Sequence, residues 1–146
     1  MAEIPRLIVD ASIGTKWHLQ DEVHADRAMD LLSAFRSNRI ELLAPTQMRA
    51  EASSAILKAF RRRRLTIAQA EASILEIENW GVRFMPDVLL PESLRLAHRM
   101  GCSFYDAMYL ALAEDIGVPF IHADDKLHRS ISGRFPLELW IEDYEL

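Results

Sequence analysis

The sequence contains little cysteine and little glycine. Its single cysteine, Cys102, rules out an internal disulfide, and this favours a reducing compartment such as the cytoplasm. Its five glycines form neither of the two common glycine-rich phosphate loops. The chain therefore lacks the usual signals of a secreted disulfide scaffold and of a nucleotide-binding loop.

Long apolar runs and an excess of basic residues are also missing. No apolar stretch approaches the length of a bilayer, and the N-terminus lacks the pattern of a secretory signal. With 17 basic and 22 acidic residues the net charge is -5, so the protein is not a general binder of polyanions. Any nucleic acid must be held by a local basic patch, by a bound metal ion, or by both.

What the chain does contain is enough apolar material for a folded core. Half of the 146 residues are apolar and 27% are charged, which is typical of a soluble globular protein. We expect one domain over residues 1–146, because no linker or internal repeat divides the sequence.

Short apolar runs alternate with helical patterns along the chain. The expected strands are residues 7–9, 40–44, 82–85 and 118–121, with a weaker last strand at 137–141 near the edge of the sheet. Strands separated by helices indicate an α/β fold with a mainly parallel sheet of four or five strands and right-handed connections.

Helix starts are predicted from capping residues. Asp21 is expected to cap a helix, and Thr46 a longer one. Thr66 with Gln69 has the spacing of a capping box, so the long helix and the next one are expected to form a hairpin. A short helix is expected to follow with Pro91 in its first turn and Leu94 facing inward.

The stretch from Ser103 to Ala113 is almost entirely apolar and predicts a helix packed on several sides. Its only charged residue is Asp106. Ser103 and Asp106 have capping-box spacing, and taken alone Asp106 is better interpreted as part of a helix cap than as a catalytic residue. Three other acids, in places that the fold would bring together, change that interpretation.

Ligands of open parallel sheets bind beyond the carboxyl ends of the strands. Asp10 and Asp124 directly follow predicted strands and are therefore expected at that edge. Asp106 begins a helix and Glu51 lies at the border of a buried helix stripe, so both can reach the same place. Four converging carboxylates repel one another unless a divalent cation neutralises them, and oxygen ligands suit Mg²⁺ or Mn²⁺. This combination suggests metal-assisted hydrolysis of phosphodiesters.

These residues also carry a family resemblance. Residues 7–12 (LIVDAS), Pro45 leading to Glu51 on a helix, residues 103–113 (SFYDAMYLALA), and Ala123-Asp124 before Leu127 resemble the PIN domain, and in particular the VapC-type ribonuclease toxins of toxin–antitoxin pairs. The resemblance spans nearly the whole chain, and the ordered set is far more specific than any one piece.

The resemblance implies a three-layer α/β/α sandwich. It implies that Asp10, Glu51, Asp106 and Asp124 bind one or two Mg²⁺ or Mn²⁺ ions, and that a water held by the metal attacks a phosphorus atom of RNA. Ser12, just after Asp10, would orient a ligand or a phosphate. A homodimer and a small antitoxin that inserts near the acidic site are implied by the resemblance alone.

The sequence departs from the family pattern at two positions. His122 stands where Thr or Ser usually precedes the last Ala-Asp, and Ser54 stands where Asn commonly follows the helix acid. His122 could join Asp124 in binding a softer metal such as Mn²⁺, but we favour a hydrogen-bonded role without a metal. Asp125 could replace Asp124, and here we favour an interaction with a helix N-terminus.

A basic run occupies the end of the long helix. Arg61, Arg62, Arg63 and Arg64 have three interpretations that remain open, namely contact with RNA, contact with the antitoxin, or a solvated helix end. Two alternatives to a nuclease also remain, a nucleotide- or phosphate-binding signalling module and a PIN-like scaffold without catalysis. The missing glycine-rich loop argues against the first, and the presence of all four acids argues against the second.

Overall fold

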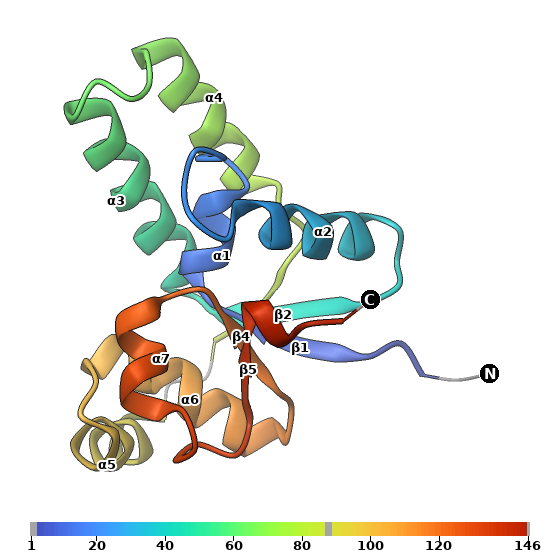
Figure 1. Cartoon of the computed structure of the whole chain (residues 1–146), viewed down its shortest axis with the longest axis vertical. Helices are drawn as coiled ribbons and strands as arrows, with labels where there is room; N and C mark the ends of the chain where they lie inside the picture. The colour runs from blue at the N-terminus through green and yellow to red at the C-terminus, as the bar shows by residue number, and fades with distance from the viewer. Residues whose placement is uncertain (1–2, 87–88, 146) are drawn as a thin grey trace.

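The computed structural model describes residues 3–86 and 89–145 of the chain (Figure 1). Five strands alternate with helices along this part of the chain. The elements are β1 (Arg6–Val9), α1 (Ala11–Lys16), α2 (Ala25–Arg36), β2 (Glu41–Pro45), α3 (Met48–Arg61), α4 (Ile67–Glu78), β3 (Arg83–Met85), α5 (Leu90–Met100), α6 (Phe104–Ile116), β4 (Phe120–His122), α7 (Asp125–Ile131), β5 (Glu138–Trp140) and the 3₁₀-helix η1 (Ile141–Asp143).

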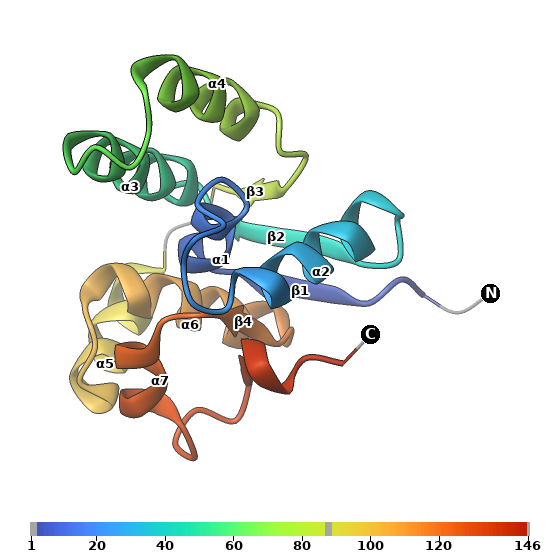
Figure 2. The same cartoon turned by 45° about the horizontal axis from the view of Figure 1, so that its top comes forward.

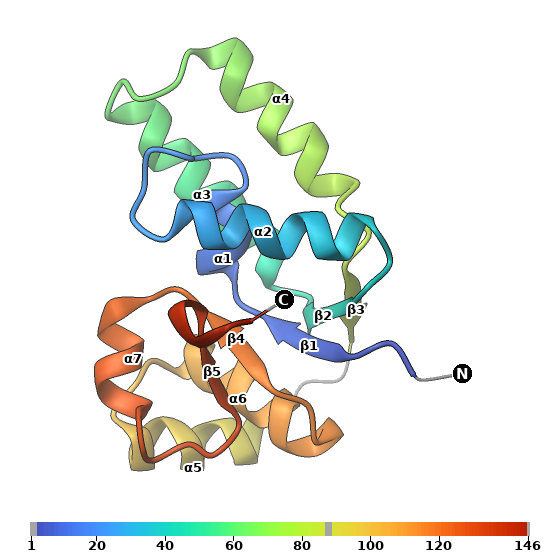
Figure 3. The same ribbon diagram turned by 45° about the vertical axis from the view of Figure 1, so that its right-hand side comes forward.

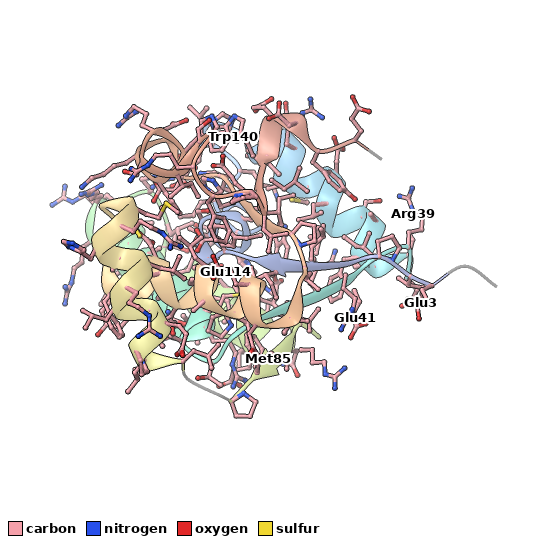
Figure 4. All side chains as sticks on the ribbon, turned by 90° about the horizontal axis from the view of Figure 1, so that it is seen from below. Glu3, Arg39, Glu41, Met85, Glu114 and Trp140 are labelled. Carbon is pink, nitrogen blue, oxygen red and sulfur yellow. The ribbon has the colours of Figure 1, made fainter. Side chains whose placement is uncertain are left out.

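The strands form one parallel sheet in the order β3-β2-β1-β4-β5. Every pairing is parallel, including Ile8 with Leu43 on one side of β1 and Ile8 with Phe120 on the other. The predicted α/β class, the parallel sheet and the weak edge strand at the C-terminal end are therefore confirmed. Met85 of β3 and Trp140 of β5 lie at opposite sides of the molecule in Figure 4, as expected for residues on the two edge strands.

Helices cover the two faces of the sheet, which gives the expected three layers. Helices α1 to α4 lie on one side, and α5 to α7 lie on the other (Figures 1 and 2). This division follows from right-handed crossovers, because the chain moves one way across the sheet from β1 to β3 and the other way from β3 to β5. The hairpin of α3 and α4 extends beyond the sheet on its side (Figure 3).

The core is centred on β1 and α6. Ile8 and Val9 are fully buried between the layers, and so are Tyr109 and Leu110 of α6. A second, smaller cluster of buried residues lies between α3 and α4, and it includes Ile56 and Ile77. The expected helix from residue 103 is confirmed, with Ser103 as N-cap and Gly117 as a left-handed C-cap, but Phe104 at its start is exposed.

Two predicted helix starts were wrong. Helix α2 has His24 as its N-cap, in a left-handed conformation (φ 68°), while Asp21 binds Arg64 instead. Helix α3 is preceded by Gln47, not Thr46. The capping box of Thr66 and Gln69 is confirmed.

Two other local features differ from the sequence analysis. Leu94 points to solvent, because the buried stripe of α5 consists of Ser93, Leu96 and Met100. Helix α1 was not predicted; it is six residues long and begins directly after Asp10. Among the helices of residues 3–86 and 89–145, none is long and apolar enough to pass through a bilayer.

Candidate metal centre

The four acids singled out from the sequence gather at the carboxyl edge of the sheet. Asp10 follows β1, Asp124 follows β4, and the sheet order reverses direction between these two strands. Glu51 lies in the first turn of α3, which follows β2. Asp106 lies in the first turn of α6, whose C-terminal end leads toward β4 and whose N-terminal end therefore lies near the opposite, carboxyl edge. This is the edge at which open parallel sheets bind ligands.

Asp10 is the most deeply buried of the four acids, with 6% of its surface exposed. Its side chain caps α1 by accepting a hydrogen bond from the Ser12 backbone N–H at 3.2 Å. Burial raises the pKa of Asp10, the bonds from Ser12 oppose this rise, and the charge of Asp106 adds to it. Ser12 also accepts a hydrogen bond from the Ala123 N–H at 2.9 Å, so its hydroxyl ties the end of β1 to the end of β4.

Glu51 is half-buried and is held by Tyr109. The Tyr109 hydroxyl donates to Glu51 Oε1 at 2.8 Å. Burial raises the pKa of Glu51 to about 7; the bond from Tyr109 opposes the rise, and the charges of Asp10 and Asp106 increase it. The same surroundings raise the pKa of Tyr109, so its hydroxyl stays protonated as the donor.

Asp106 and Asp124 complete the set. Burial raises the pKa of Asp106, hydrogen bonding with Ser103 opposes the rise, and the charge of Asp124 adds to it. Asp124 is the N-cap of α7, and its Oδ1 accepts from the N–H groups of Lys126 and Leu127 at 2.9 and 3.1 Å.

The donor set fits a hard divalent cation. The charges of Asp10 and Asp106 raise the pKa of Glu51, and the charge of Asp106 raises the pKa of Asp10. The charge of Asp124 raises the pKa of Asp106, so all four carboxylates are linked electrostatically. Within residues 3–86 and 89–145, no lysine or arginine forms an ion pair with any of the four acids. Buried carboxylates without cationic partners are costly, and Mg²⁺ or Mn²⁺ bound by oxygen ligands removes that cost.

Comparison with known proteins agrees with this geometry. The family model of the PIN domain matches residues 7–131, which include all four acids. The chain belongs to the PIN domain family. Proteins of this family are generally nucleases. No curated protein sequence matches the chain significantly.

Two solved structures share the PIN fold of the chain. PAE2754 from Pyrobaculum aerophilum superposes with a TM-score of 0.69 at 23% identity, covering 97% of this chain and 93% of the other. VapC20 of Mycobacterium tuberculosis, described as a toxin that cleaves the sarcin–ricin loop, superposes with a TM-score of 0.59 at 15% identity. The match covers 86% of this chain and 95% of VapC20.

Two histidines lie beside this PIN centre, His122, which the sequence analysis considered, and His128, which it missed. His122 is fully buried and contacts Glu138 and His128, which sequence reasoning did not single out. The alternating pattern at 137–141 predicted the strand that carries Glu138, but no local signal pairs that residue with His122. Asp125 begins α7 and is exposed, and its Oδ1 lies 3.2 Å from His24 Nε2.

The basic run lies at the far end of α3, about 15 Å along the helix axis from Glu51 at 1.5 Å per residue. Arg61, Arg62 and Arg63 are exposed. Arg64 instead binds Asp21 and Glu22, with its Nη2 2.6 Å from Asp21 Oδ1. Ser54 is exposed on α3.

Proposed function

We propose that this PIN domain is a metal-dependent endoribonuclease that hydrolyses RNA phosphodiester bonds, and that it is the toxin of a VapBC-type toxin–antitoxin pair in the cytoplasm. The observation that carries the proposal is the gathering of Asp10, Glu51, Asp106 and Asp124 at the sheet's carboxyl edge, with no lysine or arginine of the described part of the chain paired to them. The VapC20 toxin shares the fold, and this supports the choice of RNA as substrate.

In this proposal the four carboxylates hold one or two Mg²⁺ or Mn²⁺ ions. When bound, such an ion supplies a Lewis acid for the phosphate oxygens and lowers the pKa of a water. The chain's own residues prepare the place for it. Tyr109 orients the Glu51 carboxylate, Ser12 links the strand ends that carry Asp10 and Asp124, and the N-terminus of α6 favours negative charge at Asp106.

The test is cleavage of a pool of structured cellular RNA by the purified, antitoxin-free protein in Mg²⁺, in Mn²⁺ and in chelator. Asp106→Asn keeps the size of the side chain and removes its charge, so cleavage is expected to fall by roughly 100-fold or more, as typical for the loss of a main catalytic group. Asp115→Asn is the matched control, because Asp115 lies on the same helix but is exposed.

Equal cleavage by wild type and Asp106→Asn would refute the proposed role of the acids. Cleavage that persists in chelator would refute metal dependence. No cleavage of the pool or of purified ribosomal RNA in either metal, by a folded protein, would refute the ribonuclease and favour a scaffold without catalysis.

The proposed antitoxin has an apolar groove to bind. Helices α3 and α4 enclose a groove of about 510 Å³ that is almost entirely apolar. Leu57, Ile67 and Leu75 at this groove are exposed. Large apolar side chains gathered on a surface usually mark an interaction site. An amphipathic helix of the antitoxin fits such a groove, and Arg61 to Arg63 at its end would meet acidic residues of that helix.

The partner is expected to be encoded by a short open reading frame next to this gene. Ile67→Glu is expected to prevent co-purification of the product of that reading frame while leaving RNA cleavage intact, because exposed Ile67 begins α4 at the end of the groove opposite Glu51, which lies in the first turn of α3. Retained binding by this variant would exclude the groove. A homodimer is part of the proposal, and light scattering of the purified protein tests it.

A further inference from the structure

Three side chains from three different elements meet behind Asp124. His122 of β4 and Glu138 of β5 have 0% and 9% of their side chains exposed, and His128 comes from α7. His122 Nε2 lies 2.7 Å from Glu138 Oε2, and His128 Nδ1 lies 2.9 Å from the same oxygen. A single carboxylate oxygen therefore joins both imidazole rings.

Hydrogen-bond direction assigns the protons of this cluster. The backbone N–H of Asp124 points to His122 Nδ1 at 3.2 Å, so that nitrogen is the acceptor and the proton lies on Nε2. His122 therefore donates to Glu138, and His128 donates to Glu138 from Nδ1. A continuous chain of hydrogen bonds leads from the main chain of Asp124 to the Glu138 carboxylate.

Each of the two imidazole rings stacks on an aromatic ring, which fixes its orientation. Phe120 stacks on His122 with ring centroids 5.2 Å apart at 7°, and Trp140 stacks on His128 at 4.2 Å and 9°. His122 and Glu138 are thereby shielded from water, whereas 30% of the His128 side chain is exposed, and hydrogen bonds are stronger where water is excluded. Burial would raise the pKa of Glu138, but the bonds from His122 and His128 outweigh burial and lower it, so the carboxylate is charged at neutral pH.

Two histidines and a carboxylate are also a set of ligands for transition metals. The hydrogen bonds oppose that use. A metal on His122 Nε2 would move the proton to Nδ1, where it would face the Asp124 N–H, also a donor. The arrangement gives both ring nitrogens of His122 a hydrogen-bond partner without a metal.

We propose that His122, Glu138 and His128 form a positioning array that fixes the main chain of Asp124 at the metal-binding edge. This inference rests on the proposed function, in which Asp124 is a metal ligand. Partners behind a metal ligand commonly change metal affinity by about 10–100-fold when they are mutated.

The test compares Glu138→Leu with Glu138→Gln. The glutamine carbonyl still accepts both imidazole N–H bonds, whereas leucine accepts none. Mn²⁺ binding measured by calorimetry is expected to weaken by about 10-fold or more in Glu138→Leu and by less than about 3-fold in Glu138→Gln. The Mg²⁺ concentration for half-maximal RNA cleavage should rise in the same proportion, with the rate at saturating Mg²⁺ nearly unchanged. Equal Mn²⁺ affinity in wild type and Glu138→Leu would overturn the proposal.

A second measurement uses the wild-type protein, so its result is valid even if the Glu138 variants fail to fold. Nitrogen-15 NMR of the imidazoles is expected to show His122 with its proton on Nε2 only and His128 with a proton on Nδ1. A proton on His122 Nδ1 would refute the positioning array. Tight binding of Zn²⁺ that is lost in His128→Ala and kept in Asp106→Asn would also refute it and would show that the cluster is a metal site. If the wild type cuts no RNA, the proposed function fails, while Mn²⁺ affinity and imidazole protonation still decide whether the array positions Asp124.

Discussion

Replacement of Glu51 by glutamine should stabilise the metal-free protein at alkaline pH, even though it removes a proposed metal ligand. Burial and the charges of Asp10 and Asp106 raise the pKa of Glu51 from 4.5 to about 7. In the unfolded chain the carboxyl loses its proton near pH 4.5, whereas in the folded protein it holds the proton to about pH 7. The favourable contribution of this group is therefore fully present below pH 4.5 and is lost as the pH rises through 7.

The size of the effect follows from this difference. A pKa moved from 4.5 to about 7 corresponds to at most about 3 kcal/mol between the two protonation states. Glu51 is only half-buried, and solvent screening reduces this to about 1–2 kcal/mol. Glutamine cannot ionise and can still accept the hydrogen bond of Tyr109. The substitution also removes the repulsion between Glu51 and the charges of Asp10 and Asp106, and this further stabilises the folded protein at alkaline pH.

The assay is urea unfolding in chelator between pH 5 and pH 8.5. The free energy of unfolding of Glu51→Gln should equal that of the wild type at pH 5 and exceed it by about 1–2 kcal/mol at pH 8.5. This difference is equivalent to a Tm higher by about 2–8 °C. Glu78→Gln, at an exposed position on α4, is the control and should change neither value. A stability difference that is the same at both pH values, or a variant less stable at pH 8.5, would refute the electrostatic reasoning.

Three further outcomes are expected. Mg²⁺ should raise the Tm of the wild type more at pH 8 than at pH 5.5, because the carboxylates must be ionised to bind it; equal shifts in scanning calorimetry would contradict this. Tyr109→Phe should lower the unfolding free energy in urea by about 1–3 kcal/mol at pH 8 and by less at pH 5, since it removes a hydrogen-bond donor to charged Glu51; a loss that does not depend on pH would mean that only packing changed. Gly14→Ala should destabilise the protein by about 1–3 kcal/mol, because the added Cβ would lie 2.8 Å from Met48 Cε and Trp80 Cη2; unchanged urea unfolding would show that these flexible side chains move aside.

The sheet and the placement of two acids could be predicted because their signals are local. The apolar run ending at Asp10 and the one ending shortly before Asp124 mark strands without reference to the rest of the chain. Once the strands are parallel, their carboxyl ends must meet at one edge, so the two acids follow. Glu51 and Asp106 were predicted less directly, from the positions of helix starts.

The features that were missed depend on contacts between distant residues. His24 caps α2 in a left-handed conformation while its ring binds Glu142 and Asp125, more than 100 positions further along the chain. Helix α1 is too short to show a helical period, and Asp10 as its cap was the only local signal. The bond between Glu138 and His122 depends on how β5 lies beside β4, which the sequence pattern does not specify.

The order of the strands also has a consequence for synthesis. Strand β1 is made first but lies in the centre of the sheet, and its neighbour β4 begins only at residue 120. Asp10 therefore meets Asp124 only after most of the chain has left the ribosome, and the strand that carries Glu138 emerges later still. A chain interrupted before β4 contains Asp10, Glu51 and Asp106 but has no fourth acid, and its β1 has an open edge. A chain interrupted before β4 is thus expected to be prone to aggregation and unable to cut RNA, so the danger of the proposed activity to the cell would begin only after residue 124 has been made.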